Sequence, residues 1–311
     1  MRRTAAVSVA LLLVLTGCGR GTESSNSVPE MVRVGFVTKF PAAFYDEMIT
    51  GASNYAAAHP EVRVTFVRSD SATDDAGQSA LVDDLVTQGM HAIVVTPTSP
   101  QVQPALQRAV DAGVKVVLVD NDIPEWRDKT AVVATDNLAG GKLAGAWLAG
   151  RLAPGAKVGI LQGRADSPSL TARVNGVKAT FVGRFPIVAE PETDCDEAKG
   201  RDAAKAMLLA HPDLAAIYAA CGPPILGAIQ ALKAVGRKPG EVLLVGFDAL
   251  PEEVEAIAAG HESASVAQFP AEMGLIGLQT AVVAVRGFNV GSHVDTGSEL
   301  VTITNYYRWL R

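Results

Sequence analysis

Short polar clusters interrupt the apolar sequence, and their side chains are of the kinds that bind hydroxyl groups. The clusters are residues Thr38 to Tyr45, Asp120-Asn121-Asp122, Asp136-Asn137, Gly163 to Arg173, Asp194-Cys195-Asp196, Cys221-Gly222, Asp248 and Gln268. Carboxylate, amide and guanidinium groups hydrogen-bond to hydroxyls, and the rings of Phe40, Phe44 and Tyr45 can rest against C–H faces. If the fold brings the clusters together, their chemistry is the recognition of a small polyhydroxyl solute.

Catalytic chemistry finds less support in the sequence. No Gly-x-Ser-x-Gly turn is present, as a serine hydrolase would need, and no P-loop or Gly-x-Gly-x-x-Gly follows an expected strand. The five histidines are scattered, and neither His-Glu-x-x-His nor a paired Cys-x-x-Cys occurs. The net charge of −6 disfavours nucleic acid as a partner. We therefore expect neither an enzyme nor a metal centre, and no cofactor.

The elements that must position these clusters alternate regularly. Short β-branched runs are expected as strands at 32–37, 62–67, 92–96, 115–119 and 131–134, with helical periods at 44–58, 74–88 and 101–112 between them. The rhythm restarts with strands at 157–161, 186–189, 215–219, 242–246, 264–267 and 300–304, and helices at 138–152, 170–182, 196–210, 225–235, 252–259 and 271–285. This pattern predicts parallel sheets covered by helices.

The length of the chain indicates that this pattern forms two domains. A chain of 311 residues exceeds what one hydrophobic core usually serves. The predicted fold class is therefore α/β, with two similar doubly wound parallel-sheet domains in tandem. In open parallel sheets, ligands bind beyond the carboxyl ends of the strands, which is where the polar clusters fall.

The N-terminal residues are typical of a bacterial lipoprotein signal peptide. Arg2 and Arg3 precede an apolar run, which closes on Leu15-Thr16-Gly17-Cys18. We expect 1–17 to be cleaved, leaving Cys18 lipidated at the start of a Gly- and Ser-rich tether, 18–31. The alternative is a membrane-spanning anchor, for which an apolar core of about 11 residues is short of the roughly 20 needed. The protein would then work outside the cytoplasmic membrane, anchored to it.

Two cysteines remain after Cys18. In an oxidising compartment Cys195 and Cys221 would tend to form a disulfide. The alternative, two buried free thiols that pack as small apolar side chains, stays open.

Five stretches carry a resemblance to a known family. They are FYDEMITGA at 44–52, ATDNLAGGKLAG at 134–145, TARVNG at 171–176, LLVGFDALPE at 243–252 and SVAQFP at 265–270. In this order, the chain resembles the periplasmic sugar-binding proteins of ABC transporters, specifically the ribose-binding branch of the type I fold. The resemblance implies a monomer that captures a sugar or polyol between two domains and delivers it to an ABC permease.

The resemblance also implies a site. Phe44 and Tyr45 would pack against the sugar, and Asp120 and Arg173 would bind its hydroxyl or ring oxygens. Asp248 and Gln268 match two further hydrogen-bonding positions. The full predicted set of ligand-binding residues is Phe44, Tyr45, Asp120, Asn121, Arg173, Cys195, Cys221, Asp248 and Gln268.

Several of these residues have plainer interpretations. Asp120 and Asp248 could each cap the helix that follows, and Phe44 and Tyr45 could be core residues. Trp126 could supply an aromatic face to the ligand or pack on the domain surface.

Three positions depart from the family pattern, and they put ribose itself in doubt. Asn121 stands where ribose binders usually have arginine. Cys195 replaces a frequent aromatic residue, and Cys221-Gly222 replaces an Asn-Asp pair. A disulfide at the last two positions would stiffen one cleft wall instead of stacking on a sugar.

The expected mechanism is closure about a three-segment hinge near 135–136, 268–270 and 287–298. The predicted N-terminal domain is 32–135 plus 269–288, and the C-terminal domain is 136–268 plus 289–311. A ligand-presenting role toward a receptor kinase, or for a quorum signal, is the alternative to transport. Repressors of the same fold carry an N-terminal helix-turn-helix, where this chain has an export signal.

Overall fold

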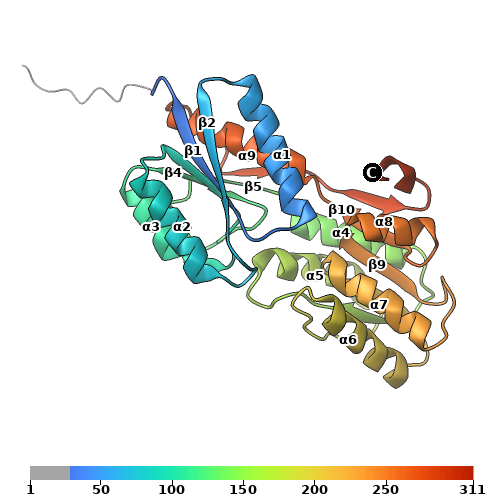
Figure 1. Ribbon diagram of the computed structural model, residues 1–311. Helices are drawn as coiled ribbons and strands as arrows, with labels where there is room; N and C mark the ends of the chain where they lie inside the picture. The colour runs from blue at the N-terminus through green and yellow to red at the C-terminus, as the bar shows by residue number, and fades with distance from the viewer. Residues whose placement is uncertain (1–28, 311) are drawn as a thin grey trace, which may run out of the picture.

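The computed structural model describes residues 29–310. The predicted signal peptide, the lipidation site Cys18 and most of the tether lie outside the described residues. The described chain forms two α/β lobes, each built on one sheet with helices on both faces (Figure 1). The predicted α/β architecture of two parallel-sheet domains is confirmed.

The sheet of the first lobe has the strand order β11-β5-β4-β3-β1-β2, and all of its pairs are parallel. Its strands are β1 (Val32–Thr38), β2 (Val62–Arg68), β3 (Ala92–Val95), β4 (Lys115–Val119), β5 (Ala131–Ala134) and β11 (His293–Asp295). Helices α1 (Ala43–Ala58) and α9 (Pro270–Val285) cover one face, and α2 (Asp75–Thr87) and α3 (Gln103–Asp111) the other. The central strands are buried on both faces, which explains their continuous apolar sequence.

The sheet of the second lobe has the order β12-β10-β9-β8-β6-β7. Its strands are β6 (Lys157–Leu161), β7 (Ile187–Ala189), β8 (Leu214–Ala219), β9 (Leu243–Asp248), β10 (Ala264–Ala267) and the antiparallel β12 (Glu299–Thr302). Helices α4 (Asn137–Ala149) and α5 (Pro168–Phe181) pack on one face. Helices α6 (Glu197–Ala210) and α7 (Gly222–Ala234) pack on the other, and α8 (Pro251–Ala258) lies beside the C-terminal turn Tyr306–Arg308.

The chain passes between the lobes three times, and the first and third crossing segments are joined by hydrogen bonds. Thr135 Oγ1 donates to the carbonyl of Gly297 at 3.2 Å, and the Asp136 amide donates to Asp295 Oδ1 at 2.9 Å. The Thr296 amide donates to the carbonyl of Ala134 at 3.1 Å. These two segments therefore form a hydrogen-bonded part of the hinge.

One part of the predicted domain division is wrong. Residues 289–311 were expected wholly in the second domain, but His293–Asp295 forms β11 and pairs with β5 of the first sheet. The third crossing therefore lies between Asp295 and Glu299. A strand of three residues between Gly291 and Gly297 is too short to show a periodicity, so the sequence pattern could not reveal it.

Close approach of helices sets the position of one side chain important below. Helix α4 packs directly on α5, and a Cβ atom at Gly141 would lie 2.0 Å from the backbone oxygen of Arg173. A side chain at Gly141 would push α5, and Arg173 with it, away from its place.

Candidate functional site

A cavity of about 440 Å³ lies between the lobes, at the carboxyl ends of the two sheets. All nine residues of the predicted site line it, from both lobes. The first lobe contributes Phe44, Tyr45, Asp120 and Asn121, and the second contributes Arg173, Cys195, Cys221, Asp248 and Gln268. Of the strand-end clusters, Asp122, Asp136, Asn137 and Asp196 do not line this cavity, and contact of the nine residues with a ligand stays a prediction.

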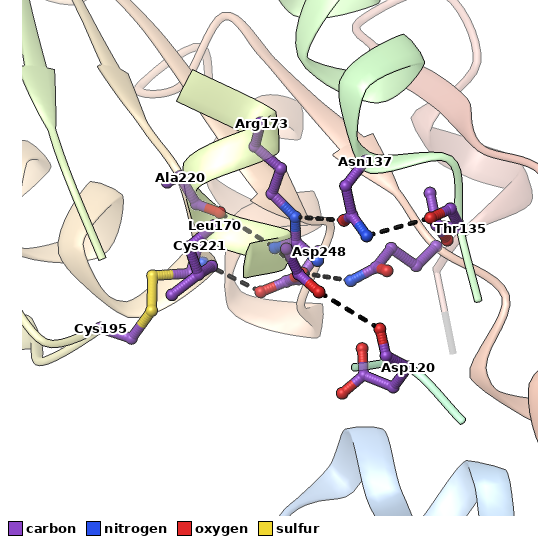
Figure 2. A network of polar contacts seen from close by, with 12 residues as sticks. Asp120, Thr135, Asn137, Leu170, Arg173, Cys195, Ala220, Cys221 and Asp248 are labelled. Atoms are coloured by element: carbon purple, nitrogen blue, oxygen red, sulfur yellow. Dashed lines mark hydrogen bonds and ion pairs between the residues drawn. A yellow bond between two sulfur atoms is a disulfide. The ribbon is translucent and has the colours of Figure 1, made fainter. Parts of the chain in front are cut away.

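Arg173 organises the wall that the second lobe contributes. It lies on α5 and is only 3% exposed. Its Nε donates to Asn137 Oδ1 at 2.8 Å, and its Nη1 donates to the carbonyl of Ala220 at 2.9 Å and to Asp248 Oδ1 at 3.1 Å (Figure 2). Its guanidinium also stacks 3.8 Å from the ring centroid of Phe247. These contacts hold the guanidinium in one orientation at the cavity wall.

Asp248 is the second centre of this wall. It ends β9 with a φ of 97°, in the left-handed region that few non-glycine residues adopt. Besides Arg173, its carboxylate accepts from Gln268 Nε2 at 2.6 Å and from the Gly222 amide at 3.3 Å. Gly222 begins α7, the helix that precedes Asp248, so Asp248 accepts a hydrogen bond at the start of that helix. Asp248 makes no hydrogen bond to α8, the helix that follows it in the described chain, so the expectation that it caps a following helix is wrong. Oε1 of Gln268 is buried without a partner among the described residues.

The two remaining cysteines form a disulfide in this wall. Cys195 and Cys221 are bonded, with their Cα atoms 5.9 Å apart (Figure 2). Cys195 follows Asp194 in a turn where both residues have positive φ, of 56° and 52°. The bond ties this turn to the start of α7, so the structure favours the disulfide over two free thiols.

The first lobe presents a different wall, in which the aromatic rings pack edge to face. The ring centroids of Phe40 and Phe44 each lie 5.3 Å from that of Tyr45. Tyr45 is 7% exposed and belongs to the core, and Phe44 packs partly against it. Both the core and the cavity interpretations of these residues therefore hold. Burial raises the pKa of the Tyr45 phenol well above its usual value, so the hydroxyl stays protonated.

Asp120 follows β4 with a φ of 65° and is 7% exposed. Its carboxylate makes no hydrogen bond with any residue of the described part, so it caps no helix there. Burial raises the pKa of this carboxyl, and the positive charges of Lys39 and Arg173 oppose the rise. Its backbone oxygen accepts from Ser169 Oγ of the other lobe at 3.4 Å.

Sequence reasoning did not single out two basic residues of the cavity, Lys39 and Arg164. Arg164 pairs with Asp166 through two bonds of 3.0 and 2.7 Å. Its Nη1 reaches across to the first lobe and donates to the carbonyl of Ala72 at 3.0 Å. Lys39 lies directly after β1, and Arg164 three residues after β6. Asking which cations follow strands would have found both.

Trp126 does not line the cavity. It is 2% exposed in the core between the first sheet and α2 and α3, and its Nε1 donates to Gln107 Oε1 at 2.6 Å. The option that it supplies an aromatic face to a ligand is wrong, and it packs within its own lobe.

Residues 29–310 contain neither a candidate metal site nor a candidate membrane-spanning helix. No cluster of three His, Cys, Asp or Glu residues that could hold a metal ion occurs in this range. Among the helices of the same range, none combines the length and apolar character needed to cross a membrane.

Known proteins are similar to this chain in both sequence and fold. Residues 34–288 match the family described as periplasmic binding protein domain. The chain is 32% identical to the D-ribose/D-allose-binding protein of Pseudomonas aeruginosa, over 97% of this chain and 99% of that protein. It is 30% identical to the ribose import binding protein RbsB of Escherichia coli, over 90% and 93%. An ABC transporter solute binding protein from Mycobacterium smegmatis with bound glycerol superposes with a TM-score of 0.81 at 32% identity, over 90% and 97%.

Proposed function

The chain belongs to the periplasmic binding protein family, and we propose that it captures a sugar or sugar-like polyol between its lobes and delivers it to an ABC importer. Members of this family bind solutes for ABC transporters and are not enzymes. The two relatives named above are binding proteins for ribose, a pentose, and one of them also for allose, a hexose.

One observation carries the proposal, namely that both lobes aim hydrogen-bonding groups into the same cavity. In the second lobe, Gln268 Oε1 is a buried hydrogen-bond acceptor without a donor among the described residues. In the first lobe, the Asp120 carboxylate is a second acceptor. A hydroxyl-rich solute supplies donors to both, so it would bridge the lobes and favour the closed form by its differential affinity. The bonds from Arg164 to Ala72 and from Ser169 to Asp120 already span the gap, which supports a closed state of this kind.

A thermal-shift and calorimetry panel tests the proposal. The panel contains D-ribose, D-allose, myo-inositol and glycerol. A ligand present at 100 times its Kd should add about 2.7 kcal/mol to the free energy of unfolding. If no sugar or polyol in an extended panel raises the unfolding temperature, the proposal fails.

Delivery to a permease is tested separately, by uptake. Deleting the gene should abolish import of the bound solute. Retained import combined with a lost transcriptional response to the solute would instead support the ligand-presenting alternative. We propose that the protein acts as a monomer, which sedimentation velocity would check.

We also propose that Cys18 anchors the protein to the membrane from outside. Metabolic labelling with a palmitate analogue should mark the wild type and leave Cys18→Ser unlabelled. The variant should be released into the medium or periplasm, and a labelled variant would contradict the anchor.

A further inference from the structure

Lys39 occupies an unusual position in the cavity. It directly follows β1, its side chain lines the cavity, and it is half-buried. It forms no hydrogen bond or ion pair with any residue in the described range. By contrast, Lys129 and Lys178 are paired with Asp122 and Glu190. Even partial burial of an ammonium group without a partner is unfavourable, so its retention calls for a compensating contact.

The charges around Lys39 come from both lobes. Burial lowers the pKa of Lys39, and the charge of Asp120 opposes that change most strongly. Arg164, Arg173 and Asp166 of the second lobe also act on it. Both arginines already have carboxylate partners, because Arg173 pairs with Asp248 at 3.1 Å and Arg164 with Asp166 at 2.7 Å. Lys39 and Asp120 are thus neighbours of opposite charge that are left without direct partners.

The two groups together define which ligand group fits beside them. A hydroxyl can accept a hydrogen bond from an ammonium and donate one to a carboxylate at the same time. A carboxylate ligand could accept from Lys39, but it would set its own charge against Asp120 and Asp248. The cations that line the cavity are Lys39, Arg164 and Arg173, and the carboxylates are Asp120, Asp194, Asp248 and Glu252, so the site offers no surplus positive charge to an anion.

We propose that Lys39 is a specificity-determining ligand contact, which with Asp120 binds one hydroxyl group of an uncharged polyhydroxyl solute and disfavours sugar acids. The inference rests on the proposed function and narrows its substrate class. It assigns the first lobe a cationic donor that reaches the ligand from β1.

The test compares Lys39→Met with Lys115→Met, an exposed lysine at the opposite end of the same sheet. Calorimetry measures binding of D-ribose, D-allose, myo-inositol and glycerol, and of D-ribonate, D-allonate and D-glucuronate. We expect Lys39→Met to weaken the tightest neutral probe at least tenfold and Lys115→Met to stay within twofold of the wild type. None of the acids should bind the wild type more tightly than the tightest neutral probe.

Thermal unfolding without any probe separates a ligand contact from a structural role. Removing an unpartnered buried charge should leave the unfolding temperature of Lys39→Met unchanged or raise it. A lowered unfolding temperature, or a loss of affinity below tenfold, would overturn the role of Lys39 while the proposed function stands. Tighter binding of an acid would overturn the uncharged class. Failure of the wild type to bind any neutral probe would overturn the proposed function and this inference together.

Discussion

The two walls of the cavity differ in how far the protein satisfies its own polar groups. In the second lobe, Arg173, Asp248 and Gln268 form a connected network next to a disulfide. In the first lobe, the side chains of Lys39 and Asp120 have no partners in the described part of the chain. The second wall is therefore largely preorganised, with Gln268 Oε1 as a buried acceptor without a partner among the described residues, whereas the first wall keeps both a cation and a carboxylate available to a ligand.

This difference separates stability from affinity. Substitutions in the second wall should damage the fold as well as binding, because they leave buried groups unpaired. Substitutions in the first wall should damage binding alone.

The largest effect is expected for Arg173→Met. Removing one partner of a buried ion pair leaves Asp248 uncompensated, and the free energy of unfolding should fall by about 3–5 kcal/mol. Urea denaturation measures the change, and calorimetry should show lost binding. Arg151→Met is the matched control, because Arg151 is exposed and stacks on Trp147. Equal stability of wild type and Arg173→Met would remove the distinction between the walls.

The double variant Cys195→Ser/Cys221→Ser should follow. The bonded residues are 26 positions apart, and opening a loop of this length should cost about 3 kcal/mol of unfolding free energy. Urea curves recorded without reductant measure it. Wild type treated with reductant should behave like the variant, and a variant as stable as the oxidised wild type would contradict the expectation.

Asp120→Asn should show the opposite pattern. Loss of a hydrogen bond to a charged group, worth about 1.5–3 kcal/mol, should weaken the tightest neutral probe roughly tenfold to a hundredfold. The free energy of unfolding should stay the same or rise, because the buried carboxylate has no partner to lose. Asp122→Asn, in the same loop but outside the cavity, should bind normally. An equal loss of binding in both variants would mean that the loop, and not the carboxylate, matters.

The last prediction concerns the pH dependence of stability, which buried carboxyl groups of the second lobe should dominate. Glu253 and Glu262 are both buried in the second lobe, where burial raises the pKa of Glu253 to about 8 and that of Glu262 well above its usual value. The folded state then holds protons that the unfolded state releases above its usual carboxyl pKa of about 4.5. The contribution of this pair to stability is therefore complete below about pH 4.5 and is lost as the pH rises to about 8 and above.

Urea midpoints measured from about pH 5 to about pH 8 should decline in the wild type and decline less in Glu262→Gln. Glu255→Gln, an exposed neighbour on α8, should keep the wild-type slope. A midpoint that rises with pH would show that the pair is ionised in the folded protein.

Most of the fold follows from local patterns in the sequence. Parallel strands that are buried on both faces have continuous apolar sequences, as in Ala92–Val95, and these sequences predicted where the strands lie. Helix starts were less exact where proline opens the helix, as at Pro168, because proline is tolerated in the first turn. Strand β11 left no signal because it is so short.

The sequence indicated which residues line the cavity, but it did not indicate which of them contact one another. Strand-end positions named residues that line the cavity. Which of them face one another depends on strand order and on how the lobes meet, so the Arg173–Asp248 pair, 75 positions apart, could not be read from spacing. Lys39 was overlooked because a lysine after a strand is ordinarily solvated, and its burial depends on the other lobe.

The last strands carry a consequence for how the molecule is made. Strand β11 completes an edge of the first sheet, and β12 completes an edge of the second. During synthesis from the N-terminus, the first half lacks a strand until residue 295 has emerged, and the second half lacks one until residue 302 has emerged. Ending the chain after Arg286 would remove an edge strand from both halves. A nascent or partly translocated chain that ends there therefore contains no complete lobe.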